Sequence, residues 1–89
     1  MAVTVDQLKE AIIDQTREVE AMIERYRERL NDECDLKYLK WINALELVVE
    51  SNEQTLNLDW DEVSPEDIQW HYNVLVSHQH RLQNAATTR

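Results

Sequence analysis

Apolar residues recur at spacings of three and four over three separate stretches of the chain, the period of a helix with one buried face. The first stretch covers residues 5–30. Its stripe consists of Val5, Leu8, Ile12, Val19, Met22, Ile23, Tyr26 and Leu30. Gln15 and Thr16 interrupt this stripe. Because 26 helical residues span about 39 Å, this helix needs another long helix beside it, from the same chain or from a second copy.

Local signals mark both ends of the first helix. Thr4 and Gln7 have the spacing of a capping box, and Val3 and Leu8 occupy the hydrophobic-staple positions on either side of the cap. Asn31 follows the last apolar residue, and asparagine tolerates the left-handed conformation that ends many helices. Since the chain contains no glycine, we expect Asn31 to terminate this helix.

The second stretch, residues 33–52, is the most apolar part of the chain. Asp32 or Asp35 is placed to cap it, so the turn after the first helix is short and favours an antiparallel hairpin. One face carries Tyr38, Trp41, Ile42, Leu45, Val48 and Val49, and a second side carries Leu36, Leu39 and Leu47. A helix that is apolar over so much of its circumference is usually central. We therefore expect it to contact both other helices, with a partner as a further option.

Residues 53–63 lose the helical period, and Leu56, Leu58 and Trp60 alternate with polar residues. Alternation indicates an extended segment. Because the chain offers no second strand, we expect an irregular linker whose apolar side lies on the bundle.

The third helix has the clearest start, since Ser64 is a good cap and Pro65 suits the first helical position. Its main stripe consists of Ile68, Tyr72, Leu75 and Leu82. The pattern ends near Gln83, and the residues after it have no large apolar anchor.

These patterns predict an all-α fold: a small three-helix bundle with a long antiparallel hairpin and helices at about 5–30, 33–52 and 65–83. Residues 1–84 form a single helical domain, and residues 85–89 form a frayed tail. A homodimer that pairs two hairpins into a larger bundle is nearly as well supported.

Composition excludes several classes of function. The chain has 89 residues, 18 acidic and 9 basic side chains, no glycine and one cysteine. One cysteine cannot make a disulfide scaffold, and phosphate-binding loops need glycine. The net charge of −9 argues against direct nucleic-acid binding. The start lacks a secretory signal and no apolar run approaches membrane-spanning length, so with Cys34 as a lone thiol we expect a cytoplasmic protein without a membrane contact.

The charge is concentrated. Residues 31–67 carry eleven acids and two bases, and the segment from Glu50 to Asp67 carries seven acids and no base. Such a surface either keeps the protein soluble or binds a partner with a basic surface. Trp60 is the aromatic side chain best placed to bind a partner, or else it is a buried latch that pins the linker. The residues predicted to bind a partner are Glu50, Glu53, Asp59, Trp60, Asp61, Glu62, Glu66, Asp67 and Trp70.

Metal and catalytic sites find little support. His71, His78 and His80 lack the i, i+4 spacing of helical zinc ligands, and nothing requires Cys34 to approach them. The segment from Thr55 to Glu66 resembles a calcium loop but has threonine as its first ligand and Trp60 in place of the turn glycine. Two carboxylate pairs one helical turn apart could hold a divalent metal, although any acidic helix produces such pairs: Glu20 with Glu24 and Glu46 with Glu50. We expect no catalytic residues, no metal and no cofactor.

The function that these features favour is that of a non-enzymatic interaction module, a small regulator, adaptor or inhibitor that binds a protein and forms a homodimer. One alternative is an acidic mimic of nucleic acid that occupies the basic groove of another protein, and a second is a metal-dependent helical enzyme or sensor. In size and composition the chain is similar to small acidic helical accessory proteins of phages and mobile elements, some of which inhibit host enzymes that act on nucleic acids.

Overall fold

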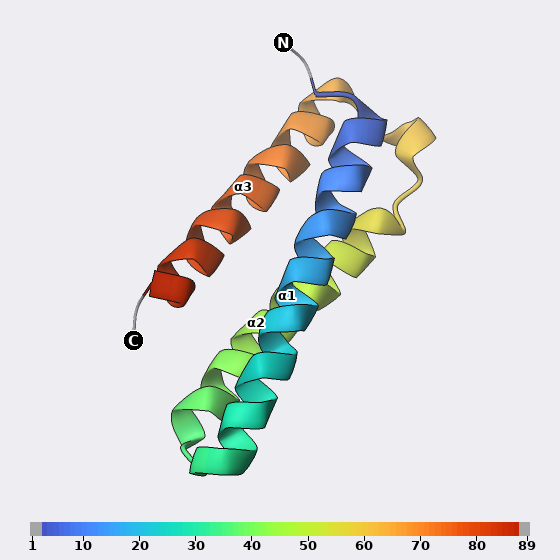
Figure 1. Ribbon diagram of the computed structural model, residues 1–89. Helices are drawn as coiled ribbons and strands as arrows, with labels where there is room; N and C mark the ends of the chain where they lie inside the picture. The colour runs from blue at the N-terminus through green and yellow to red at the C-terminus, as the bar shows by residue number, and fades with distance from the viewer. Residues whose placement is uncertain (1–2, 88–89) are drawn as a thin grey trace.

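Three long helices and one short 3-10 turn make up the computed structural model, which describes residues 3–87. The elements are α1 (Val5–Glu33), α2 (Leu36–Leu56), η1 (Trp60–Glu62) and α3 (Pro65–Thr87). α1 and α2 form a long antiparallel hairpin, and α3 lies beside it but ends before the α1–α2 turn (Figure 1). The described residues include no strand. The all-α class and the helical hairpin are therefore confirmed.

The predicted caps at the helix starts are also confirmed, although the second helix starts at Leu36 and not at residue 33, which belongs to α1. The Thr4 hydroxyl accepts a hydrogen bond from the Gln7 N–H, and the Gln7 side-chain oxygen accepts one from the Thr4 N–H, both at 3.1 Å. Asp35 caps α2 by accepting from the Lys37 N–H at 3.0 Å. Ser64 accepts from the N–H of the third residue of α3 at 3.2 Å. Each cap satisfies a backbone donor that has no partner within its helix.

The end of α1 differs from the prediction. The helix continues through Asn31 to Glu33, and Cys34 adopts the left-handed conformation, with φ 53° and ψ 35°. Asp35 must be extended to cap α2, so the left-handed residue of this two-residue connection has to come immediately before it. The geometry of the tight turn therefore outweighs the preference of asparagine for the left-handed conformation. The prediction that Asn31 ends the first helix was wrong.

The linker also differs from the prediction. α2 runs on to Leu56, and Trp60–Glu62 forms a 3-10 turn instead of an extended segment. The expected contact of its apolar side with the bundle is confirmed, because Leu56 and Trp60 pack against Leu8 and Ile12. α3 extends to Thr87, past the expected end near Gln83. The tail expected at 85–89 lies partly outside the described residues.

The core consists of two apolar clusters. The hairpin cluster lies toward the α1–α2 turn and contains Val19, Met22, Ile23, Ile42, Leu45 and Leu82. The linker cluster lies toward the N-terminus of α1 and contains Leu8, Ile12, Trp60 and Leu75. All three helices contribute to the hairpin cluster, whereas η1 takes the place of α2 among the buried residues of the linker cluster.

A buried polar layer separates the two clusters. It consists of Gln15, Thr16 and Asn52, which are 4, 8 and 4% exposed. The Asn52 amide donates to the Gln15 side-chain oxygen at 3.0 Å and to the Thr16 hydroxyl at 3.2 Å. The Gln15 amide donates to the Leu75 carbonyl at 2.9 Å and to the Gln79 side-chain oxygen at 3.3 Å. These bonds connect all three helices, and they explain why two polar residues interrupt the apolar stripe of α1.

Candidate functional site

The nine residues predicted to bind a partner fall in three places. Glu50 and Glu53 lie on α2, Trp70 lies on α3, and the others lie on η1, beside it, or in the first turn of α3. All seven carboxylates among the nine are exposed. Figure 1 shows η1 and the start of α3 at the end of the bundle where α1 begins. The continuous acidic run in the sequence is thus divided between the side of the hairpin and the end of the bundle.

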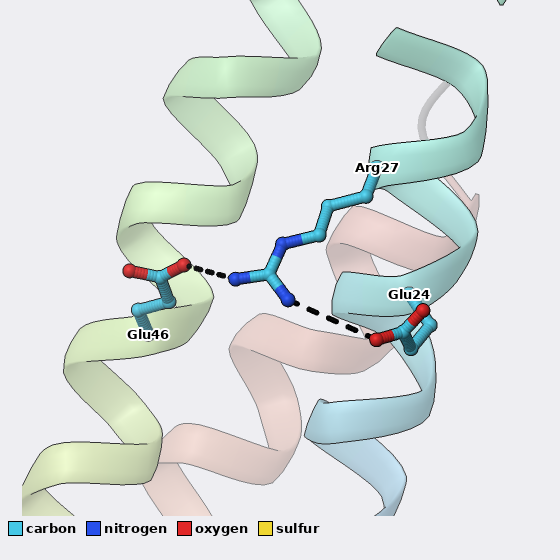
Figure 2. A network of polar contacts seen from close by, with 3 residues as sticks. All are labelled: Glu24, Arg27 and Glu46. Carbon is cyan, nitrogen blue, oxygen red and sulfur yellow. Dashed lines mark hydrogen bonds and ion pairs between the residues drawn. The ribbon is translucent and has the colours of Figure 1, made fainter. Parts of the chain in front are cut away.

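The acids on the side of the hairpin line a groove of about 490 Å³ between α1 and α2, which we call the acidic groove. Its carboxylates are Glu20, Glu24, Glu46, Glu50 and Glu53. Arg27 is the one cation in its lining; it donates to Glu46 at 3.0 Å and lies 3.8 Å from Glu24 (Figure 2). One guanidinium facing five carboxylates leaves the groove strongly negative. Its apolar floor is formed by Ile23 and Val49.

Three carboxylates of this groove, Glu20, Glu24 and Glu46, were absent from the set predicted to bind a partner. Glu20 and Glu24 lie in a half of the sequence that is close to neutral, and Glu46 precedes the acidic run that starts at Glu50, so local charge counting gave no reason to include them. The hairpin brings the two carboxylate pairs noted in the sequence, on α1 and α2, into one groove. Exposed carboxylates at this spacing attract cations mainly through their summed field, because water screens each individual pair.

A second groove, of about 280 Å³, lies between the end of α2 and α3 and is called here the tryptophan groove. Trp70 lines it and is 59% exposed, with Leu58 and Val74 as apolar neighbours in the lining. The Trp70 ring contacts His71 edge to face, with 5.0 Å between ring centroids. This contact restrains an aromatic side chain that is otherwise open to solvent.

Trp60 has the structural role that the sequence offered as its alternative, that of a buried latch. It is 9% exposed and packs in the linker cluster with Leu8, Ile12 and Leu75. The 3-10 turn directs the indole inward, against α1 and α3. Trp60 is therefore a core residue, and Trp70 is the tryptophan that a partner can reach.

The histidines and the cysteine are spread over the structure. His71 packs between aromatic rings, His80 is exposed, and Cys34 is exposed at the α1–α2 turn. His78 is half-buried; its burial, together with the nearby Arg81, lowers its pKa. Among residues 3–87, no three His, Cys, Asp or Glu side chains form a group that could hold a metal ion.

The segment that resembles a calcium loop does not form one loop. Thr55 belongs to α2, where its hydroxyl donates to the Ser51 carbonyl at 2.9 Å. Glu66 belongs to the first turn of α3. Between them the chain forms η1, so the would-be ligands are distributed over three helical elements.

Comparison with known proteins gives no relative: no family model, no curated protein and no solved structure matches the chain. In the described part of the chain, no helix has the length and apolar content needed to cross a membrane.

Proposed function

We propose that this chain is a non-enzymatic interaction module that binds a protein partner at the tryptophan groove. The observation that carries the proposal is the 59% exposure of Trp70 beside a groove with apolar lining. Tryptophan is the residue type most enriched among side chains that dominate binding energy, and leaving one so exposed costs the free protein hydrophobic stabilisation. A partner that covers Trp70 recovers that stabilisation.

The charges around Trp70 define the chemistry of this partner. Glu66 and Asp67 lie four and three residues before Trp70, which places them one helical turn away on its side of α3. Asp59 follows the groove residue Leu58. An apolar centre with a charged rim is the usual organisation of a protein interface. The partner that fits it has an apolar side chain for the groove, surrounded by lysine or arginine.

Quantitative capture from lysate tests this proposal. Protein bound to the wild-type chain should be lost with Trp70→Ala and with Glu66→Lys/Asp67→Lys. The matched controls change exposed residues elsewhere, both on α1: Ile13→Ala and Glu10→Lys/Asp14→Lys. If Trp70→Ala captures the same protein with the same affinity as the wild type, the tryptophan groove is not the binding site.

A mimic of nucleic acid is the second candidate, and the acidic groove favours it. Its carboxylates come from two helices, Glu20 and Glu24 on one side and Glu46, Glu50 and Glu53 on the other, giving two facing rows of negative charge. This is the kind of inhibitor implied by the similarity to phage accessory proteins. A mimic should be displaced from its partner by duplex DNA, and binding should weaken steeply with salt. Glu50→Lys/Glu53→Lys, within the acidic groove, should abolish binding of such a partner, and Asp59→Lys/Asp61→Lys/Glu62→Lys, at the end of the bundle, should weaken it through the summed field.

Homodimerisation and a cytoplasmic location belong to the same proposal. Leucines left exposed on α2 support the homodimer, and an exposed, unpaired Cys34 suits a reducing compartment. Sedimentation over a wide range of protein concentration tests the homodimer, since a constant monomer mass would contradict it.

A further inference from the structure

The outer face of α2, opposite the side that packs on α1, carries three exposed leucines. Leu36 is 75%, Leu39 43% and Leu47 66% exposed. Leu36, Asn43 and Leu47 are seven and four residues apart, so they follow one line along the helix. We call the surface formed by Leu36, Leu39, Asn43 and Leu47 the leucine face. Leucines spaced in this way on a helix form a seam for another helix.

Charge along α2 changes sign halfway. Residues 36–45 contain Lys37 and Lys40 and no acid, whereas residues 46–56 contain Glu46, Glu50 and Glu53 and no base. Two copies of α2 laid side by side in the same direction would put like charges together. Two copies in opposite directions put the basic half of each beside the acidic half of the other. The helix is therefore complementary to itself in one orientation only.

We propose that a second copy of this chain covers the leucine face, with the two α2 helices antiparallel and the two-fold axis near Asn43. This inference rests on the homodimer in the proposed function and adds its surface and orientation. With the axis at Asn43, Leu39 lies opposite Leu47 of the partner subunit, and the two asparagines lie opposite each other. One polar residue within an apolar helix seam fixes orientation and register, because the amide groups pair only in that alignment.

The two-fold symmetry makes a second copy a better occupant than an unrelated helix. An isologous interface uses the same patch on both subunits, so one patch must carry both the apolar seam and both signs of charge. The leucine face and its flanking charges meet this condition within a single helix. The partner proposed for the tryptophan groove carries basic residues around its apolar side chain, and Lys37 and Lys40 beside the leucine face would repel it.

Sedimentation equilibrium tests the surface. Loss of one buried leucine should weaken the dimer about tenfold. Because each substitution occurs twice at a two-fold interface, Leu47→Glu should raise the dimer dissociation constant at least about 100-fold. Ile13→Glu is the matched control, because Ile13 is an exposed apolar residue, at 39%, on α1; it should leave the constant unchanged. Circular dichroism of both variants checks that they remain helical. An unchanged constant in Leu47→Glu overturns the proposed surface.

Disulfide trapping tests the orientation. In an antiparallel pair centred on Asn43, the two Leu36 residues at the start of α2 lie about 21 Å apart along the axis, so the two Cys34 residues beyond them cannot be linked. The wild type should therefore form no disulfide dimer, whereas Asn43→Cys in a Cys34→Ser background should form one readily. Rapid linkage through Cys34 together with none through position 43 overturns the antiparallel arrangement, even if sedimentation finds a dimer. A monomer in sedimentation overturns this inference and the proposed homodimer together, and leaves partner binding at Trp70 to its own test.

Discussion

The buried polar layer allows a sharp test of how the three helices are held together. Asn52→Leu keeps the branched side-chain skeleton but removes the donors to Gln15 and Thr16. Gln15→Met keeps the length of the side chain but removes the acceptor for Asn52 and the donor to the Leu75 carbonyl. The double variant replaces both partners by apolar groups of similar shape.

The expected magnitudes follow from what each change leaves unpaired. In Asn52→Leu the buried Gln15 oxygen loses its donor, while Thr16 still donates to the Ile12 carbonyl. A buried polar atom without a partner costs about 1–3 kcal/mol, so we expect a loss of about 2 kcal/mol in the free energy of unfolding. Gln15→Met leaves the Asn52 amide with one acceptor of two and should cost about the same. The double variant contains neither the Asn52 nor the Gln15 amide, so neither amide is left buried without its partner. Its free energy of unfolding should therefore fall by about 1 kcal/mol instead of the sum of about 4 kcal/mol.

Urea denaturation of the wild type, the two single variants and the double variant measures this coupling, at one fixed protein concentration. Thermal midpoints should fall by roughly 8–16 °C in each single variant. The exposed Asn73 provides a control, since Asn73→Leu makes the same chemical change at the surface and should alter stability by less than about 0.5 kcal/mol. If the double variant loses the full sum of the single losses, the three side chains of the polar layer do not form a coupled network.

Three further predictions concern local features. Cys34→Gly should raise the free energy of unfolding by about 0.5–1 kcal/mol, because glycine adopts φ 53° without strain. Urea denaturation under reducing conditions measures the change, and a lower free energy of unfolding in the variant would contradict the prediction. Burial lowers the pKa of His78 in the folded chain below its ordinary 6.5, so as the pH falls His78 is protonated in the unfolded chain before it is protonated in the folded one. The free energy of unfolding should therefore keep its full value above pH 6.5 and decrease as the pH drops below that value. His78→Gln should flatten this profile of denaturation midpoint against pH. Arg27→Gln should cost less than about 1 kcal/mol at low salt, because both partners of its ion pair with Glu46 are half-exposed, and added salt should then stabilise the variant more than the wild type.

The parts of the fold that the sequence predicts are those decided within one helical turn. Thr4, Asp35 and Ser64 cap their helices through backbone groups two or three residues away, so the residue types alone locate the starts. The helix ends were harder to predict because they depend on distant contacts. Cys34 is left-handed because Asp35 must start α2, and α2 continues to Leu56 because that side chain packs against the linker cluster.

The candidate surfaces likewise depend partly on residue types and partly on contacts between distant parts of the chain. Which side chains are acidic is plain from the sequence, but which of them share a groove depends on the packing of α1 against α2. Trp60 and Trp70 illustrate the limit. Both are tryptophans within an acidic stretch, and only the inward turn of η1 makes the first a core residue and leaves the second exposed.

The hairpin nevertheless relates positions on α1 to positions on α2, which the pattern of a single helix does not do. In an antiparallel hairpin, residues equally far from the turn lie at the same level. Thr16 lies 18 residues before Cys34, and Asn52 lies 18 residues after it, so the two polar side chains lie at the same level and share one layer. The carboxylate pairs obey the same rule within about one helical turn, since Glu20 and Glu24 precede Cys34 by 14 and 10 residues, and Glu46 and Glu50 follow it by 12 and 16. Once Cys34 is known to be the centre of the turn, matching polar residues and charge pairs across it places Thr16 beside Asn52 and brings the two carboxylate pairs into one groove.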